Sequence, residues 1–240
     1  MCQRPRPNAS SHAAVSSDSN PDFSPMEETG KFEKALAQKQ IQVLFKRLFD
    51  LIASTVALIL LAPLLLGIAL LITLTSPGPV FFRQKREGYQ GRDFLMWKFR
   101  SMQVRHDDSM ITAQQTAAAQ GKLIKLQRDP RVTRIGKILR VTSLDELPQL
   151  FNVLNGEMSL IGPRPLVPFM LDPYPDFRRT RALMRPGITG LWQIRDRENN
   201  TSALTMMKHD LEYIERFSLA LDGKILLRTV GVVFSGKGAC

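Results

Sequence analysis

The feature that most constrains this chain is a long apolar run. Residues 51–74, LIASTVALILLAPLLLGIALLITL, contain no charged side chain. A helix of about 20 apolar residues is long enough to cross the hydrocarbon of a bilayer. A buried core helix of a soluble protein is rarely apolar on every face over such a length. We therefore predict a membrane-embedded helix, with the whole membrane segment at residues 41–78.

The same segment also indicates whether the helix crosses the bilayer or is re-entrant, with both ends on one side. Pro63 lies near its middle, where proline removes a backbone donor and clashes with the preceding turn, so we expect a kink or a helix–break–helix. Lys46 and Arg47 precede the run, and three basic residues within 83–86 follow it. Basic flanks mark the cytoplasmic side. Two such flanks favour a re-entrant helix that keeps both basic clusters in the cytoplasm, while a single crossing stays open.

The apolar run divides the chain into unequal parts. Residues 1–40 begin with a stretch that is rich in Ser, Asn and Pro, which predicts a disordered tail. No apolar leader follows Met1, so no signal peptide is predicted. Residues 79–236 are expected to form a small mixed α+β domain in the cytoplasm, and residues 237–240 a short tail.

Coarse secondary structure can be predicted within the second part. Residues Val80–Met102 indicate two short strands around a Gly88–Gly91 turn. Residues 106–121 are rich in Ala, Gln and Thr and predict a helix or a variable loop. The segment 185–194, RPGITGLWQI, indicates a Pro–Gly turn entering a strand or loop, and 205–234 has a helical pattern.

Charge and metal-binding residues limit the classes of function. The net charge of +11 suggests an anionic partner, namely nucleic acid, an acidic lipid surface or a phosphorylated substrate. Cys2 and Cys240 lie at opposite ends, which excludes a disulfide framework or a thiolate zinc site. The three histidines are scattered, so any metal would be a hard, oxygen-bound ion.

A basic amphipathic pattern covers residues 131–140. Its apolar face comprises Val132, Ile135, Ile138 and Leu139, and its basic face Arg131, Arg134, Lys137 and Arg140. Such a face is either solvated surface or, beside a membrane helix, an interfacial element. Both interpretations stay open from the sequence.

Two adjacent carboxylates, Asp145 and Glu146, follow this pattern in SLDELPQLFNVLNGEMSLIGPRP. One interpretation is a capping box formed by Ser143 and Glu146, with Asp145 favoured by the helix dipole. Pro148 makes that start marginal, because proline is tolerated only in the first turn. The other interpretation is chemical: an aspartate that arginines keep ionised can attack phosphorus or bind Mg²⁺.

Five motifs together resemble the bacterial sugar transferase family, the monotopic phosphoglycosyl transferases. They are KRLFDLIAS, SPGPVFFRQKREG, FLMWKFRSM, RVTSLDELPQLFNVLNGEMSLIGPRP and RPGITGLWQI, within residues 46–235. The resemblance implies an enzyme that moves a phosphosugar from a UDP-sugar to polyprenyl phosphate, typically undecaprenyl phosphate, and releases UMP. It also implies a re-entrant helix that holds the enzyme at the cytoplasmic leaflet.

The resemblance implies roles for individual residues. Asp145 would be the nucleophile and a Mg²⁺ ligand, with Glu146 as its catalytic partner. The implied substrate-binding residues are Lys98, Arg100, Arg140, Arg164, Arg185 and Asp210. The chain departs from the family at Ala62, where the family often has Ser before the helix-breaking proline, and in the loop RDRENN at 195–200.

These expectations define partners and a rival. The expected partners are a UDP-sugar, a polyprenyl phosphate lipid and the inner membrane, for the initiation of exopolysaccharide, capsule or glycoconjugate synthesis. Nucleic acid is not expected, because no motif for it is evident, and a homo-oligomer is allowed. The rival is a non-catalytic, basic membrane-anchored adaptor, which needs the apolar helix but not Asp145. The identity of the sugar is not predicted.

Overall fold

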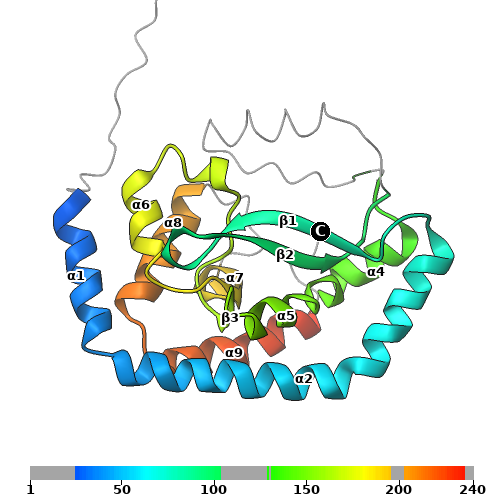
Figure 1. Ribbon diagram of the computed structural model, residues 1–240, viewed down its shortest axis with the longest axis horizontal. Coiled ribbons are helices and arrows are strands. Elements are labelled where there is room, and N and C mark those ends of the chain that lie inside the picture. Colours follow the sequence, from blue (N-terminus) through cyan, green and yellow to red (C-terminus); the bar gives the residue numbers. More distant parts are fainter. Residues whose placement is uncertain (1–24, 104–128, 130, 196–202, 236–240) are drawn as a thin grey trace, which may run out of the picture.

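The computed structural model describes residues 25–103, 129, 131–195 and 203–235, and mixes helices with two small sheets (Figure 1). The elements are α1 (Pro25–Ala37), α2 (Gln40–Thr75), β1 (Phe81–Glu87), η1 (Tyr89–Gly91), β2 (Asp93–Phe99), α4 (Arg134–Val141), η2 (Leu144–Glu146), α5 (Gln149–Leu154), β3 (Ser159–Ile161), η3 (Pro168–Met170), α6 (Pro175–Arg181), β4 (Gly187–Thr189), α7 (Leu191–Arg195), α8 (Ala203–Glu215) and α9 (Leu219–Ser235). The mixed α and β architecture is confirmed. The predictions for 1–24, 106–121 and 237–240 lie outside the described residues.

Helix α2 forms one long edge of the molecule. In Figure 1 it runs along the base and then bends upward toward α4. Pro63 lies inside the helix, which runs without interruption from Gln40 to Thr75, so the chain bends without the helix–break–helix that was the alternative (Figure 1). Within the described part of the chain, α2 is the one helix that is long and apolar enough to cross a membrane. Its most exposed apolar side chains include Leu44, Ile59, Leu60, Leu66 and Leu74.

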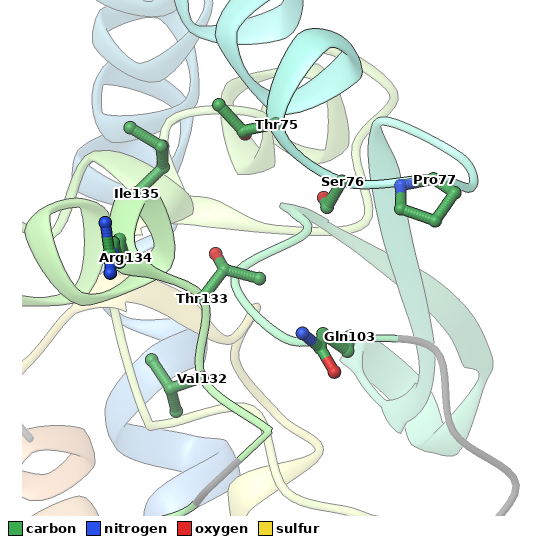
Figure 2. A pocket seen from close by; sticks show the side chains of 8 residues that line it. All are labelled: Thr75, Ser76, Pro77, Gln103, Val132, Thr133, Arg134 and Ile135. Carbon is green, nitrogen blue, oxygen red and sulfur yellow. The ribbon is translucent and has the colours of Figure 1, made fainter.

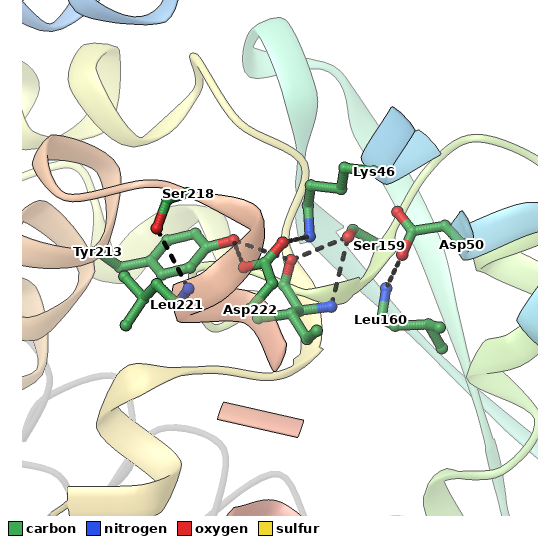
Figure 3. A network of polar contacts seen from close by, with 9 residues as sticks. Lys46, Asp50, Ser159, Leu160, Tyr213, Ser218, Leu221 and Asp222 are labelled. Atoms are coloured by element: carbon green, nitrogen blue, oxygen red, sulfur yellow. Dashed lines mark hydrogen bonds and ion pairs between the residues drawn. The ribbon is translucent and has the colours of Figure 1, made fainter. Parts of the chain in front are cut away.

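One polar stripe of α2 faces the protein. Lys46, Asp50 and Ser54 are buried at a spacing of four residues, which places them on one helical face. Lys46 pairs with Asp222 of α9 at 2.7 Å (Figure 3). Asp50 accepts a hydrogen bond from the backbone N–H of Leu160, which precedes Ile161 in β3, at 3.1 Å. The start of α2 is thereby fixed to two distant segments of the chain.

Arg47 lies beside this stripe and contacts α5. Its guanidinium donates to the carbonyls of Val153 at 2.8 Å and Leu154 at 3.3 Å, at the C-terminal end of that helix. The sequence interpretation treated Lys46 and Arg47 as flanking charges that set membrane topology. The structure uses both as contacts inside the protein, so they say little about orientation.

The predicted strand pair is confirmed. Strands β1 and β2 form an antiparallel hairpin in the register Phe81↔Phe99 to Glu87↔Asp93, and Gly91 in the turn has a φ of 70°. Asn152 of α5 covers the outer edge of β2. Its amide accepts from the backbone N–H of Trp97 at 3.0 Å and donates to the carbonyl of Leu95 at 2.8 Å. This pairing satisfies backbone groups that an edge strand leaves open.

The C-terminal part of the chain contains a second sheet, which α9 contacts. Strands β3 and β4 pair in parallel, so the segment 185–194 does enter a strand. The helical pattern at 205–234 is two helices, α8 and α9, rather than one. Phe217 between them is fully buried, and it belongs to a core cluster that also includes Tyr213 and Ile225.

The prediction of a disordered tail over residues 1–40 is wrong for its last part. Residues 25–37 form α1, which packs against α6 and α8. Phe32 and Leu36 lie against the core cluster around Phe217, and Lys39 donates to the Phe217 carbonyl at 2.8 Å. Two apolar side chains at helical spacing, together with polar contacts such as that of Lys39, therefore dock a segment whose average composition is polar.

Candidate active site

The two carboxylates lie in a short 3₁₀ turn between α4 and α5. Ser143 has a φ of 57° and makes no side-chain capping hydrogen bond. A capping residue normally has extended backbone angles, so the left-handed conformation excludes the predicted capping box. Helix α5 begins later, at Gln149, with Pro148 at its N-cap. The Asp145–Glu146 dyad is therefore not the first turn of an α-helix.

The dyad sits directly beside the apolar helix. Leu144 packs against a buried cluster that includes Ile68 and Ile72 of α2 and Leu139 of α4. Hydrophobic burial of this kind fixes the turn without using any polar group of the dyad. Asp145 follows Leu144 in sequence, so the site is built next to the C-terminal part of α2.

Basic side chains from two elements surround the dyad. Lys98 of β2 pairs with Glu146 at 2.7 Å. Arg140, from the last turn of α4, donates through Nε to the hydroxyl of Ser101 at 2.9 Å. Burial raises the pKa of Asp145 to about 6, the neighbouring Glu146 adds to the rise, and Lys98 and Arg140 oppose it. Asp145 thus titrates close to neutrality in a positively charged setting.

Arg86 is a further basic residue near the dyad, since the charge of Glu146 acts on its pKa. From the sequence it is predicted only as one of the basic residues that flank the apolar run. Burial and the charge of Arg164 lower the pKa of Arg86 to about 9, and Glu146 opposes that shift. Its guanidinium donates to the carbonyl of Pro165 at 3.1 Å. The alternation of side chains along the two predicted strands is the signal that could have identified Arg86. The register places Arg86 on the same face of the hairpin as Lys98.

Arg164 and Asp210 contact each other and stabilise the Gly-Pro-Arg-Pro turn near the dyad. The backbone N–H of Arg164 donates to Asp210 at 3.3 Å, and its guanidinium lies 4.9 Å from the centre of the Trp192 ring. Asp210 is only 2% exposed and lies 3.8 Å from the guanidinium of Arg181. Burial raises the pKa of Asp210 to about 6, against the charge of Arg181. Asp210 therefore holds the Gly-Pro-Arg-Pro turn from inside, rather than facing a substrate.

Arg100 and Arg185 are not brought to the dyad by their contacts. Arg100 is 4% exposed and donates to the carbonyls of Ser76 at 2.7 Å and Pro77 at 2.6 Å. Arg185 donates to the carbonyl of Gly156 at 2.9 Å, beyond the C-terminal end of α5, whereas the dyad precedes that helix. Of the predicted site residues, Lys98 and Arg140 accompany the dyad most closely.

A pocket opens where α2 ends and α4 begins. Figure 2 shows Ser76 and Pro77 on one side of it and Thr133 on the other. Its described lining residues are Thr75, Ser76, Pro77, Gln103, Val132, Thr133, Arg134 and Ile135. None of the residues predicted for the site is among them.

Of the two carboxylates, Asp145 is the one that fits a magnesium ion that would be shared with a substrate. Among the described residues, no group of three or more His, Cys, Asp or Glu side chains could hold a metal by itself. Mg²⁺ is commonly bound through one or two carboxylates together with substrate phosphates. Asp145 suits that role, because a cation would offset the burial that raises its pKa. Glu146 is already occupied by Lys98.

Comparison with known proteins identifies the family. Residues 41–236 match the model of the bacterial sugar transferase family. The chain belongs to this family. The family and the enzyme class expected from the motifs, a phosphoglycosyl transferase, are thus confirmed.

Individual relatives are similar over most of this chain. The exopolysaccharide production protein ExoY of Rhizobium meliloti is 40% identical over 231 residues, covering 95% of this chain and 99% of that protein. A UDP-glucose:undecaprenyl-phosphate glucose-1-phosphate transferase of Xanthomonas campestris is 45% identical over 204 residues, or 82% of this chain and 40% of the relative. A UDP-N-acetylgalactosamine-undecaprenyl-phosphate N-acetylgalactosaminephosphotransferase of Aeromonas hydrophila is 40% identical over 210 residues, covering 85% of this chain and 47% of the relative. The chain thus spans less than half the length of the last two.

Proposed function

We propose that this member of the family transfers a sugar 1-phosphate from a UDP-sugar to polyprenyl phosphate, typically undecaprenyl phosphate, and releases UMP. One observation carries the proposal: a buried aspartate, Asp145, lies among cationic side chains on a turn that packs against an apolar helix. An anionic sugar nucleotide and an anionic lipid would meet at such a place. The names of the relatives include both kinds of substrate.

In the first step the carboxylate of Asp145 attacks the sugar-proximal phosphorus of the donor. A bond forms between the carboxylate oxygen and phosphorus, and the bond from that phosphorus to the bridging oxygen breaks. The electron pair leaves with UMP, and the sugar phosphate stays on Asp145 as an acyl phosphate. Burial suits Asp145 to this role, because a poorly solvated carboxylate near neutral pKa is a more reactive nucleophile than a hydrated one.

In the second step an oxygen of the lipid phosphate attacks the same phosphorus. The acyl phosphate bond breaks, which restores the Asp145 carboxylate and leaves a diphosphate between lipid and sugar. Lys98 orients Glu146 beside the reacting group, and Arg140 supplies positive charge for the phosphoryl oxygens. Mg²⁺, held by Asp145 and the phosphates, would stabilise charge on those oxygens.

The lipid acceptor gives the apolar helix a purpose. We propose that α2 is re-entrant in the inner membrane and that the catalytic domain lies on the cytoplasmic face. The bend of α2 and its exposed apolar side chains support this placement (Figure 1). A site held at the headgroup level restricts the search for a lipid phosphate and fixes its orientation. The positive net charge would also attract anionic lipid and substrate.

The proposal is tested by UMP release. Purified membranes containing the protein would be incubated with polyprenyl phosphate, Mg²⁺ and a panel of UDP-sugars. The proposal predicts UMP and a lipid-linked sugar diphosphate with at least one donor, and none of either with Asp145→Asn. If every donor leaves UMP at background while the protein remains bound to membranes, the adaptor hypothesis replaces this one.

A further inference from the structure

We propose that Arg100 is a positioning residue, which fixes the dyad relative to the C-terminal end of α2. The inference rests on the proposed function, since it concerns how that active site is aligned. Sequence similarity suggested Arg100 as a substrate contact, whereas its contacts in the structure point to the membrane helix.

The first part of the argument is where the guanidinium goes. Nη1 donates to the carbonyl of Pro77 at 2.6 Å, and Nη2 donates to both the carbonyl and the hydroxyl of Ser76, at 2.7 and 2.8 Å. Both residues directly follow α2. Carbonyls at a helix C-terminus lack partners within the helix and favour a cation. Arg100 therefore closes the end of α2 with a planar, two-pronged contact.

The second part is what Arg100 is joined to. It immediately follows β2, two residues after Lys98, which pairs with Glu146 at 2.7 Å. The next residue, Ser101, accepts a hydrogen bond from Arg140 at 2.9 Å. One short extended segment thus connects the end of α2, the dyad and the arginine of α4.

The third part is that this segment has little room to move. A Cβ built on Gly136 of α4 would lie 1.9 Å from the carbonyl oxygen of Ser101, so the two backbones are in direct contact. The same carbonyl accepts from the backbone N–H of Thr133 at 3.1 Å. The segment is thus fixed to α4 at Ser101 and to the end of α2 through Arg100. Losing the Arg100 contact would release one of these two attachments and change where Lys98 holds Glu146.

Burial argues against a direct substrate contact. Arg100 is 4% exposed, and both of its terminal nitrogens are engaged at Ser76 and Pro77. A phosphate could reach the guanidinium only if those contacts opened. A positioning residue needs no such opening, because it acts through the atoms it already holds.

The test separates kcat from KM in bilayer nanodiscs, with a UDP-sugar that the wild type accepts. Arg100→Ala should lower kcat by about 10- to 100-fold and leave the KM for the donor within about twofold, because the groups that bind the donor remain. Arg100→Lys should recover part of kcat, since an ammonium replaces the charge but not the fork. Arg92→Ala, an exposed arginine on the same hairpin, is the matched control and should match the wild type.

A milder variant covers the case in which Arg100→Ala does not fold. Ser76→Ala removes one of the acceptors and keeps the backbone carbonyls, so kcat should fall by roughly two- to fivefold with KM unchanged. In the double variant the two effects should not add, because both changes break the same contact.

A raised KM for the donor with unchanged kcat would overturn the proposal and make Arg100 a substrate contact. Unchanged kcat in both Arg100→Ala and Ser76→Ala would also overturn it. A wild type that releases no UMP with any donor would instead overturn the proposed function itself, so the two failures are distinguishable.

Discussion

Two aspartates of this protein have similar pKa values and different surroundings. Burial raises the pKa of both Asp145 and Asp210 to about 6, and nearby positive charge opposes the rise in both places. Asp210 faces Arg181 at 3.8 Å and accepts the backbone N–H of Arg164. Around Asp145, the nearest cations are held by other groups: Lys98 by Glu146 and Arg140 by Ser101.

The difference teaches that a raised pKa does not by itself mark a catalytic group. Asp210 is a support, because its partners are the backbone of Arg164 in the turn and the guanidinium of Arg181 in α6. Beside Asp145, Lys98 is paired with Glu146, whereas Arg140 donates to the neutral hydroxyl of Ser101, so the charge of Arg140 remains for a ligand. The partners of a carboxylate, and what lies next to them, distinguish a nucleophile from a structural acid.

Of the substitutions that test the difference between the two aspartates, Asp145→Asn should have the largest effect. Turnover should fall by more than about 1000-fold, because an amide cannot form the acyl phosphate. The thermal unfolding temperature should stay the same or rise, since the variant removes a poorly solvated carboxylate. UMP release and thermal unfolding in nanodiscs measure the two effects.

The matched control is Asp172→Asn, an exposed aspartate that should keep full activity. Activity in the Asp145→Asn variant, shown to be free of deamidation, would remove Asp145 from the nucleophile role.

The reverse pattern is expected for Asp210→Asn. The change leaves the buried guanidinium of Arg181 without its charge partner, which should cost about 3 kcal/mol of unfolding free energy. The unfolding temperature should fall by roughly 6–12 °C for a chain of this size. Tryptophan fluorescence, to which Trp192 beside Arg164 and Trp97 both contribute, follows the transition. A loss of turnover with unchanged stability would contradict the division between the two aspartates.

Arg140→Ala tests whether the cations beside Asp145 act on substrate. We expect kcat to fall by roughly 100-fold, the size typical of losing one donor to a developing negative charge. Lys137→Ala, an exposed basic residue on the same helix, serves as the control. Equal and small effects of both substitutions would mean that the basic face of α4 is merely solvated.

The smallest expected effect is a dependence of kcat/KM for UMP release on pH. In the proposed first step the attacking group is the ionised carboxylate of Asp145, whose pKa burial raises to about 6. The kcat/KM for UMP release should therefore be constant above pH 7 and fall about tenfold per pH unit well below pH 6. Raising the Mg²⁺ concentration should move the midpoint downward, since a bound cation favours the ionised form. A rate independent of pH down to 4.5 would contradict the burial argument.

Much of this architecture could be predicted from local sequence. The uncharged run predicted α2, and alternation around two glycines predicted the β1–β2 hairpin. Adjacent carboxylates after a basic helix indicated the dyad. These features depend on residues close together in the chain, where periodicity and side-chain chemistry are informative.

Features that depend on distant partners could not be predicted. Helix α1 is stabilised by Phe32 and Leu36 against the cluster around Phe217, far away in sequence. Local sequence indicates Lys46 as a charge that sets membrane topology, whereas in the structure Lys46 pairs with Asp222, far away in the chain. Ser143 matched a capping motif, but its left-handed backbone excludes that role. In each case a tertiary contact or a backbone angle overrode a local preference.

The central claim is that Asp145 becomes covalently loaded, and trapping the loaded enzyme tests it most directly. The protein in nanodiscs would be given a UDP-sugar labelled in its sugar, with Mg²⁺ and no lipid acceptor, then quenched, digested and mapped by mass spectrometry. The account predicts about one UMP released per enzyme, with the phosphosugar on the peptide that contains Asp145. Label on a different side chain, or UMP that is released only when donor and lipid are both present, would contradict it.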